Sequence, residues 1–237
     1  MSKKLIMSCM ALVAFAAFVL PATASATNDP QLTETTFNAE GKDIGTHTVP
    51  PGAKVIGTNI GNADFMNTTG EGTPQVSCSS ALLTGTVTKN EGGTVEGSIS
   101  TADFSGTGPL SKHNPAKEYS ECTASIGNAA ITVSTPLVIK SDPTMATDEF
   151  RVSGTGAGGT VTFNIVSTVA GQCKYLTTST VKGDYTTAPA TTKLVVRNTQ
   201  AGSGAKLEEG GFLCPTSGQL RMTFFLETED GTELSIS

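Results

Sequence analysis

Four cysteines are the residues of this chain whose type and spacing most directly predict chemistry. They are Cys78, Cys122, Cys173 and Cys214, and they follow an apolar N-terminal segment that contains a fifth, Cys9. An even number of cysteines in an exported chain predicts disulfides, with three possible connectivities. We favour Cys78 with Cys122 and Cys173 with Cys214, because each pair lies at the ends of a block of similar length that has the pattern of strand, turn and strand.

Metal chemistry has weaker candidates. No C-x-x-C pair occurs, and the only histidines, His47 and His113, lie beside no cysteine, so we expect neither zinc nor any other cofactor. Acids around turns could supply oxygen ligands for calcium. The two best clusters are Asp142, Asp148 and Glu149, and Glu229, Asp230 and Glu233. Neither matches an EF-hand loop, so the sequence leaves a structural calcium open.

Hydrolytic chemistry is the other class to weigh. No G-x-S-x-G motif occurs, and a Ser-His-Asp triad would have to use His47, in a strand-like segment, or His113, in a polar loop. A glycosidase needs a pair of carboxylates. The candidates are Glu96, Asp103, Glu118, Glu121, Asp148 and Glu149. Scattered exposed acids are the rule on an acidic exported protein, so we expect no catalytic residues, with a secreted glycosidase-like hydrolase as the alternative.

The segment 154–159 reads G-T-G-A-G-G and matches the dinucleotide fingerprint G-x-G-x-x-G. That chemistry needs a helix to begin at the motif, because the helix N-terminus holds the pyrophosphate. The residues that follow, T-V-T-F-N-I-V at 160–166, have the alternation of a strand instead. We therefore interpret the motif as a glycine-rich hairpin turn.

The N-terminal segment predicts export. Lys3 and Lys4 precede an apolar run from Leu5 to Leu20, and Ala24-Ser25-Ala26 has the pattern of a signal-peptidase site. The run is shorter than the roughly 20 residues that a membrane-spanning helix needs. We predict a signal peptide, residues 1–26, with cleavage after Ala26, no membrane span in the mature chain, and a secreted, extracellular or cell-envelope location.

The composition after cleavage limits the partners. Without the first 26 residues the chain has 211 residues with 13 Lys and Arg against 21 Asp and Glu, a net charge of −8. Such a chain repels phosphate backbones and anionic lipid, so nucleic acid is excluded as a partner. Trp is absent, and only Tyr119, Tyr175 and Tyr185 could stack on a sugar. We expect an unknown extracellular protein or glycan as partner and leave the oligomeric state open.

The elements that must position these residues are strands. Thr, Gly and Ser dominate, and no segment after residue 26 has the three-four spacing of an amphipathic helix. We predict a single antiparallel β-sandwich or jelly-roll-like domain, residues 27–237, stapled by two disulfides. Two Ig-like halves, 27–140 and 141–237, are the alternative. The expected strands are 35–39, a pair flanking the turn at 50–52 of which the second is 55–60, then 76–88 and 94–104 around a turn at 90–93, closed by 121–133. After these come 130–140, 150–153, 161–169, 175–181, 193–197, 220–228 and 232–237, with loops at 27–34, 62–73 and 106–118.

Several motifs in the first half carry a resemblance. They are V-S-C-S-S-A at 76–81, G-T-V-T-K-N-E-G-G-T-V at 85–95, A-D-F-S-G-T-G at 102–108 and Y-S-E-C-T at 119–123. Together they resemble secreted Thr/Gly-rich proteins of actinobacteria, and more distantly small exported β-proteins such as the alkane-oxidation activator PraB. The resemblance covers mainly residues 55–140. It implies an exported β-sandwich and brings no catalytic residue with it.

The expected role is therefore a non-enzymatic one, in binding or structure, at the cell envelope, the surface or outside the cell. A further alternative is a self-assembling fibre or matrix subunit. In such a subunit the segment 27–39 would add as a strand to the open sheet edge of a neighbour, because main-chain pairing gives affinity without a specific pocket.

Overall fold

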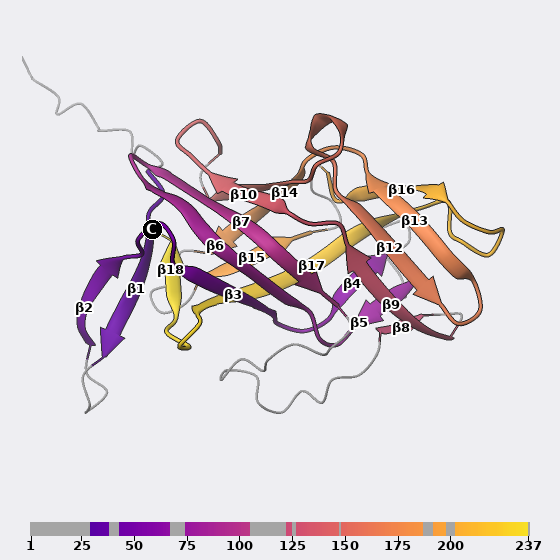
Figure 1. The fold of residues 1–237 in the computed structure, drawn as a ribbon, viewed down its shortest axis with the longest axis horizontal. Coiled ribbons are helices and arrows are strands. Elements are labelled where there is room, and N and C mark those ends of the chain that lie inside the picture. The colour runs from indigo at the N-terminus through magenta and orange to yellow at the C-terminus, as the bar shows by residue number, and fades with distance from the viewer. Residues whose placement is uncertain are drawn as a thin grey trace, which may run out of the picture.

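The structure is a computed structural model that describes residues 29–37, 43–66, 74–104, 122–124, 127–146, 148–186, 192–197 and 202–236. The predicted signal peptide lies outside these residues, as do His113, Glu118, Tyr119 and Glu121. The described chain forms eighteen strands and one three-residue 3-10 helix, Ala157–Gly159, so the predicted all-β class is confirmed (Figure 1). The strands are β1 Leu32–Phe37, β2 Asp43–Thr48, β3 Lys54–Asn59, β4 Ala63–Met66, β5 Val76–Cys78, β6 Leu82–Glu91, β7 Thr94–Asp103, β8 Cys122–Ala124, β9 Gly127–Val133, β10 Leu137–Ser141, β11 Glu149–Ser153, β12 Thr162–Ser167, β13 Gly171–Thr177, β14 Val181–Thr186, β15 Lys193–Val196, β16 Gly204–Glu209, β17 Ser217–Thr228 and β18 Leu234–Ile236.

Fifteen of these strands form one continuous antiparallel sheet. Their order is β15-β14-β11-β10-β7-β6-β3-β17-β16-β13-β12-β9-β8-β5-β4. The strands at the two ends of this order, β15 and β4, each pair with β17 as well. The pairing therefore closes two rings that share β17, one running from β15 to β17 and the other from β17 to β4. Opposite walls of the rings face each other across one core, as in a sandwich.

The long strand β17 serves the two rings with different halves. In its first half, residues 217–219 pair with β16 and residues 219–221 pair with β4. In its second half, residues 222–225 pair with β15 and residues 224–228 pair with β3. A strand of twelve residues is long enough for this double use because each residue adds about 3.3 Å.

A separate three-stranded sheet, in the order β18-β1-β2, lies at one end of the molecule (Figure 1). We call this sheet the cap. It is attached to β6 through the buried side chain of Asn90, whose Oδ1 accepts from the Leu32 amide at 2.9 Å. The Asn90 Nδ2 donates to the carbonyl oxygens of Leu32 at 2.6 Å and Val49 at 2.8 Å. Thr192 makes a second attachment, because its Oγ1 accepts from the Ile236 amide at 2.6 Å.

The core is one contiguous cluster of apolar side chains that runs through both rings. Inside the second ring it contains three packed aromatic rings, those of Phe65, Phe163 and Tyr175, with centroids 4.9 to 5.7 Å apart. The Phe65 ring lies directly over Gly218, where an added Cβ would come within 2.2 Å of it. Glycine at this position of β17 therefore makes room for the aromatic cluster.

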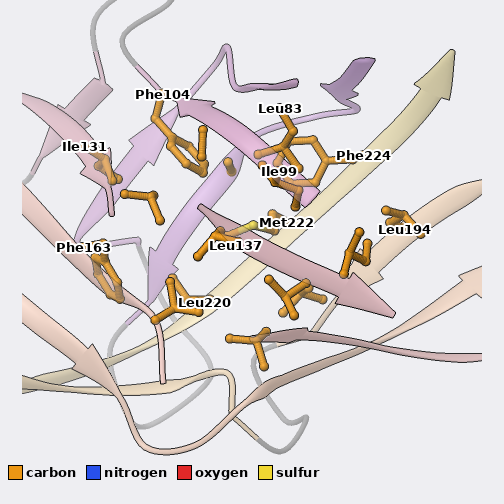
Figure 2. Close-up of a pocket in the computed structure, with 18 of the residues that line it drawn as sticks. Leu83, Ile99, Phe104, Ile131, Leu137, Phe163, Leu194, Leu220, Met222 and Phe224 are labelled. Atoms are coloured by element: carbon orange, nitrogen blue, oxygen red, sulfur yellow. The ribbon is translucent and has the colours of Figure 1, made fainter. Parts of the chain in front are cut away.

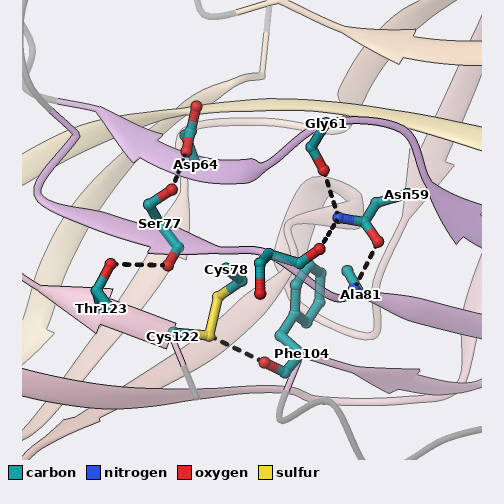
Figure 3. Close-up of a disulfide and its surroundings, with 10 residues drawn as sticks. Asn59, Gly61, Asp64, Ser77, Cys78, Ala81, Phe104, Cys122 and Thr123 are labelled. Atoms are coloured by element: carbon teal, nitrogen blue, oxygen red, sulfur yellow. Dashed lines mark hydrogen bonds between the residues drawn. A yellow bond between two sulfur atoms is a disulfide. The ribbon is translucent and has the colours of Figure 1, made fainter. Parts of the chain in front are cut away.

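Both predicted disulfides are confirmed. Cys78 of β5 is bonded to Cys122 of β8, and these strands are also paired directly in the sheet (Figure 3). Cys173 of β13 is bonded to Cys214, which lies in the turn between β16 and β17. The sequence separations are 44 and 41 residues. In the chain-entropy model, a disulfide that closes a loop of this size stabilises the folded protein by roughly 4 kcal/mol.

Several strand predictions need correction in the N-terminal part. The segment 62–73 was predicted to be a polar loop, but β4 lies inside it and all four of its residues are buried. The segment 27–34 was predicted to be loose, but β1 begins at Leu32, which is buried against Ile236 of β18. Strand β1 pairs with β18 along Leu32–Glu34 and with β2 along Thr33–Phe37, so part of the segment considered for strand addition is already paired on both sides within this chain, and the fibre alternative stays a prediction.

The second half also differs from the prediction in detail. The segment 130–140 forms parts of two strands, β9 and β10, because the chain passes from one ring to the other at the cis peptide bond between Thr135 and Pro136. The predicted strand 175–181 likewise covers the end of β13 and the beginning of β14. The strand β16 was not predicted. In the described residues, strands from 27–140 and 141–237 alternate in one sheet, which favours a single unit over two Ig-like halves.

Candidate functional site: an apolar cavity inside the sheet

An apolar cavity of about 90 Å³ lies inside the sheet. A single buried water needs about 10 to 15 Å³ on the same scale, so the space is large for an ordinary packing defect. Strands of both rings contribute its walls, and Figure 2 shows that the labelled side chains carry only carbon apart from the Met222 sulfur. Six that define its shape are Leu83, Ile99, Leu137, Phe163, Met222 and Phe224.

A second cavity of about 80 Å³ adjoins the first toward the cap. The two share wall residues from five strands, Leu83, Ile99, Ile139, Phe150 and Leu194. The second cavity is bounded at its end by Leu32 and Ile236 of the cap. The cap therefore closes the interior of the first ring.

Glycines on three neighbouring strands form part of the wall of the second cavity. Gly57, Gly85 and Gly97 line the second cavity, and they come from the neighbouring strands β3, β6 and β7. Across these strands Gly57 is opposite Leu83, and Gly85 is opposite Ile99. A large residue on one strand thus faces a glycine on the next, and the interior is filled only in part.

The charged residues along the walls all have partners. The Asp64 carboxylate accepts hydrogen bonds from Ser77 at 2.7 Å and from Arg221 (Figure 3 shows the first). Lys140 forms an ion pair with Asp142, 2.9 Å from Nζ to Oδ2. The Glu96 carboxylate accepts from the Thr88 hydroxyl at 3.3 Å. Water in such a space would find few groups to bond, and apolar cavities of this kind stay dry.

The predicted carboxylate candidates in the parts of the chain that the structure describes are placed as follows. Glu149 is held between Arg151 at 2.6 Å and Lys182 at 3.6 Å. Glu96 and Asp103 lie seven residues apart on β7. Asp148 has a φ of 63°, and its carbonyl accepts from the Tyr185 amide. Glu118 and Glu121, with His113, are outside the described residues.

Among the calcium candidates, Asp142, Glu229 and Asp230 have carboxylates engaged in other bonds. Asp142 accepts from the hydroxyl of Thr144 and pairs with Lys140, and these bonds lower the pKa of Asp142 from 3.8 to about 2. Glu229 pairs with Lys54 at 3.2 Å, and hydrogen bonds from Thr228 and the Thr232 amide lower the pKa of Asp230. Glu233 forms a β-bridge with Glu227. Within the described ranges, no three His, Cys, Asp or Glu side chains are grouped to hold a metal ion.

The remaining candidates are placed as follows. The segment 154–159 is a turn with a 3-10 helix, and the strand β12 follows it. A strand at this place was predicted, in place of the helix that a dinucleotide-binding motif requires. The segment is not a hairpin, because β11 and β12 pair with other strands. His47 is exposed on β2. Tyr175 and Tyr185 are buried, so neither offers a platform for a sugar. Burial raises the pKa of Tyr175 to about 12, and its hydroxyl donates to the Pro215 carbonyl at 2.8 Å.

Among the residues whose placement the structure gives, none belongs to a helix with the length and apolar character to cross a bilayer. The location predicted from the N-terminal segment stays a prediction, as does the nature of the partner.

Sequence reasoning did not find the cavity. The sequence feature most closely related to the cavity is glycine paired with a large apolar residue on the next strand, as in Gly57 with Leu83 and Gly85 with Ile99. This feature can be recognised only when the strand register is known. No protein-family model, curated protein or solved structure matches the chain significantly. The resemblance to secreted Thr/Gly-rich proteins of actinobacteria therefore stays a prediction, and the function has to be argued from the interior of the molecule.

Proposed function

We propose that the protein is an exported, non-enzymatic binding protein that holds a small uncharged apolar molecule inside its sheet. The observation that carries the proposal is the apolar cavity of about 90 Å³. An engineered cavity of about 150 Å³ lined by Leu, Ile and Phe stays dry and binds benzene or xenon. Closed rings of eight strands can likewise hold one small ligand in the interior.

Export is supported by two features of the chain. Two disulfides staple the fold, and disulfides persist in oxidising compartments outside the cytosol. The predicted signal peptide, residues 1–26, gives a route to such a compartment. A non-enzymatic role is supported by the character of the walls, because they are mostly apolar and the three charged residues on them, Asp64, Glu96 and Lys140, are each bonded to another side chain.

The proposal is tested by titrating the mature protein with benzene and with n-pentane. Binding is followed by methyl NMR shifts of Leu137 and Leu220, and by the rise in unfolding temperature. A ligand at ten times its dissociation constant stabilises the native state by about 1.4 kcal/mol. We expect saturable shifts confined to the cavity walls. Absence of saturable shifts at the solubility limit of both probes refutes the proposal.

The matched variants are Val152→Phe and Val166→Phe. Val152 lines the cavity, so a phenyl ring there occupies the space that the ligand needs. Val166 lies on β12 with 48% of its surface exposed, so the same change leaves the interior alone. We expect Val152→Phe to abolish binding of both probes and Val166→Phe to bind them as the unaltered protein does. Equal binding by both variants places the probes elsewhere and contradicts the proposal.

A further inference from the structure

We infer that the two cavities are halves of one site, and that this site binds an unbranched, uncharged hydrocarbon chain more tightly than a compact ring or a fatty acid. The inference rests on the proposed function and adds the shape and charge of the ligand. It is based on the order of the wall residues along the strands, on the glycines between the strands, and on the partners of the charged groups.

The wall residues are arranged along the strands in a line. On β17, alternate residues point to the same face, and Leu220, Met222 and Phe224 line the first cavity while Leu226 lines the second. At about 3.3 Å per residue, the path from Leu220 to Leu226 is roughly 20 Å long. The combined space is therefore long in the strand direction, and a flexible chain fits it better than a ring.

Gly57 leaves open the part of this path that lies in the second cavity. A Cβ added at Gly57 would lie 3.4 Å from Leu83 Cβ and 3.5 Å from Leu226 Cδ2, which are ordinary contacts with two cavity walls. A side chain at this position would therefore occupy the second cavity without forcing the backbone apart. Gly57 lines only the second cavity, so a substitution there separates the two halves of the site experimentally.

The charge of the ligand follows from the partners of the wall residues. A fatty acid would need a cation for its carboxylate, and the one lysine on the walls, Lys140, is 2.9 Å from Asp142. A cationic ligand would need a free carboxylate. Asp64 is already bonded to Ser77 and Arg221, and Glu96, the other carboxylate on the walls, accepts from Thr88 and interacts electrostatically with Lys140. Burying an unpaired charge is costly, so both classes are rejected and an uncharged chain is accepted.

The inference is tested with n-pentane, n-hexane, n-heptane and n-octane, and with octanoate at neutral pH. Each buried methylene contributes about 0.8 kcal/mol, so affinity should rise about fourfold per carbon while the chain extends into the second cavity. Methyl NMR should show Leu220 responding to every alkane and Leu226 responding only to the longer ones. Octanoate should bind at least a hundredfold more weakly than n-octane.

Two glycine variants separate this inference from the proposed function. Gly57→Val should weaken n-octane at least tenfold and leave n-pentane unchanged, and Gly57→Ala gives the same test with a smaller side chain if valine prevents folding. The control is Gly204→Val on β16, where an added Cβ makes contacts of 3.6 and 3.7 Å with Thr178 and which lines neither cavity. It should change no affinity.

Each outcome decides one claim. If n-pentane binds and Val152→Phe abolishes this binding, but n-octane binds no more tightly than n-pentane or is unaffected by both Gly57 variants, the single elongated site is refuted and the proposed function stands. If octanoate binds as tightly as n-octane, the uncharged class is refuted. If neither n-pentane nor benzene binds, the proposed function fails and this inference fails with it.

Discussion

Truncating Asn90 to alanine should detach the cap from the rest of the molecule. The Asn90 side chain makes three hydrogen bonds to backbone groups, with the amide and carbonyl of Leu32 and the carbonyl of Val49. The three residues are 5%, 4% and 1% exposed, so water does not replace the lost amide. The Leu32 carbonyl keeps a bond from the Val49 amide, at 3.1 Å.

The magnitude follows from the groups that lose the Asn90 side chain as partner. The Leu32 amide and the Val49 carbonyl each lose it, and a buried group without its partner costs about 1 to 3 kcal/mol. We therefore expect Asn90→Ala to lower the free energy of unfolding by about 3 kcal/mol. The loss should be local, so hydrogen exchange should rise first in β1, β2 and β18.

The matched control is Asn59→Ala. Asn59 is 3% exposed and also makes three side-chain bonds, donating to the carbonyls of Gly61 and Ser79 and accepting from the Ala81 amide (Figure 3). Urea unfolding should give losses of similar size for the two variants. Hydrogen exchange followed by mass spectrometry should separate them, because Asn59 is bonded to the first disulfide region and not to the cap. A loss below about 0.5 kcal/mol for Asn90→Ala, or the same exchange pattern in both variants, refutes the attachment.

Two further predictions concern pH and the second disulfide. The pKa of Asp142 is about 2 in the folded protein and 3.8 by default, so its charged form stabilises the fold above about pH 4, and this stabilisation is lost as the pH falls from 4 toward 2. The free energy of unfolding, measured by urea titration, should be lower at about pH 2.5 than at about pH 6, and Asp142→Asn should reduce this difference by about 2 kcal/mol. An equally large difference in the variant contradicts the assignment. Replacing Cys173 and Cys214 together by alanine should lower the free energy of unfolding by roughly 4 kcal/mol and leave the other bridge intact in peptide mapping. A scrambled or absent bridge between Cys78 and Cys122 would show that the two staples are not independent.

The sequence was sufficient for features that depend on neighbouring residues. The turn at 90–93 joins β6 to β7 as predicted, because Gly92 and Gly93 adopt positive φ values of 57° and 67°. The two disulfides were predicted from the spacing of strand-turn-strand blocks. Strand β17 was predicted nearly to its ends, since its inward face is apolar over alternate positions.

Features that depend on distant pairing could not be predicted. Strand β4 is short and buried on both faces, so it lacks the alternation that marks a half-exposed strand. Strand β16 carries Lys206, Glu208 and Glu209 and has the composition of a loop. The closure of the rings and the cavity inside them arise from which strands meet across β17, and pairing partners so far apart in the chain leave no local signal.

The shared strand also sets the order of events when the chain is made. Strands β3, β4, β15 and β16 all pair with β17 and all precede it in the chain, so each of them waits for a partner that is synthesised later. Until it is present neither ring can close, and strands made early keep unpaired edges. Closure of both rings, and with it sealing of the interior, therefore depends on the one strand of the fifteen-stranded sheet that follows the other fourteen in the chain.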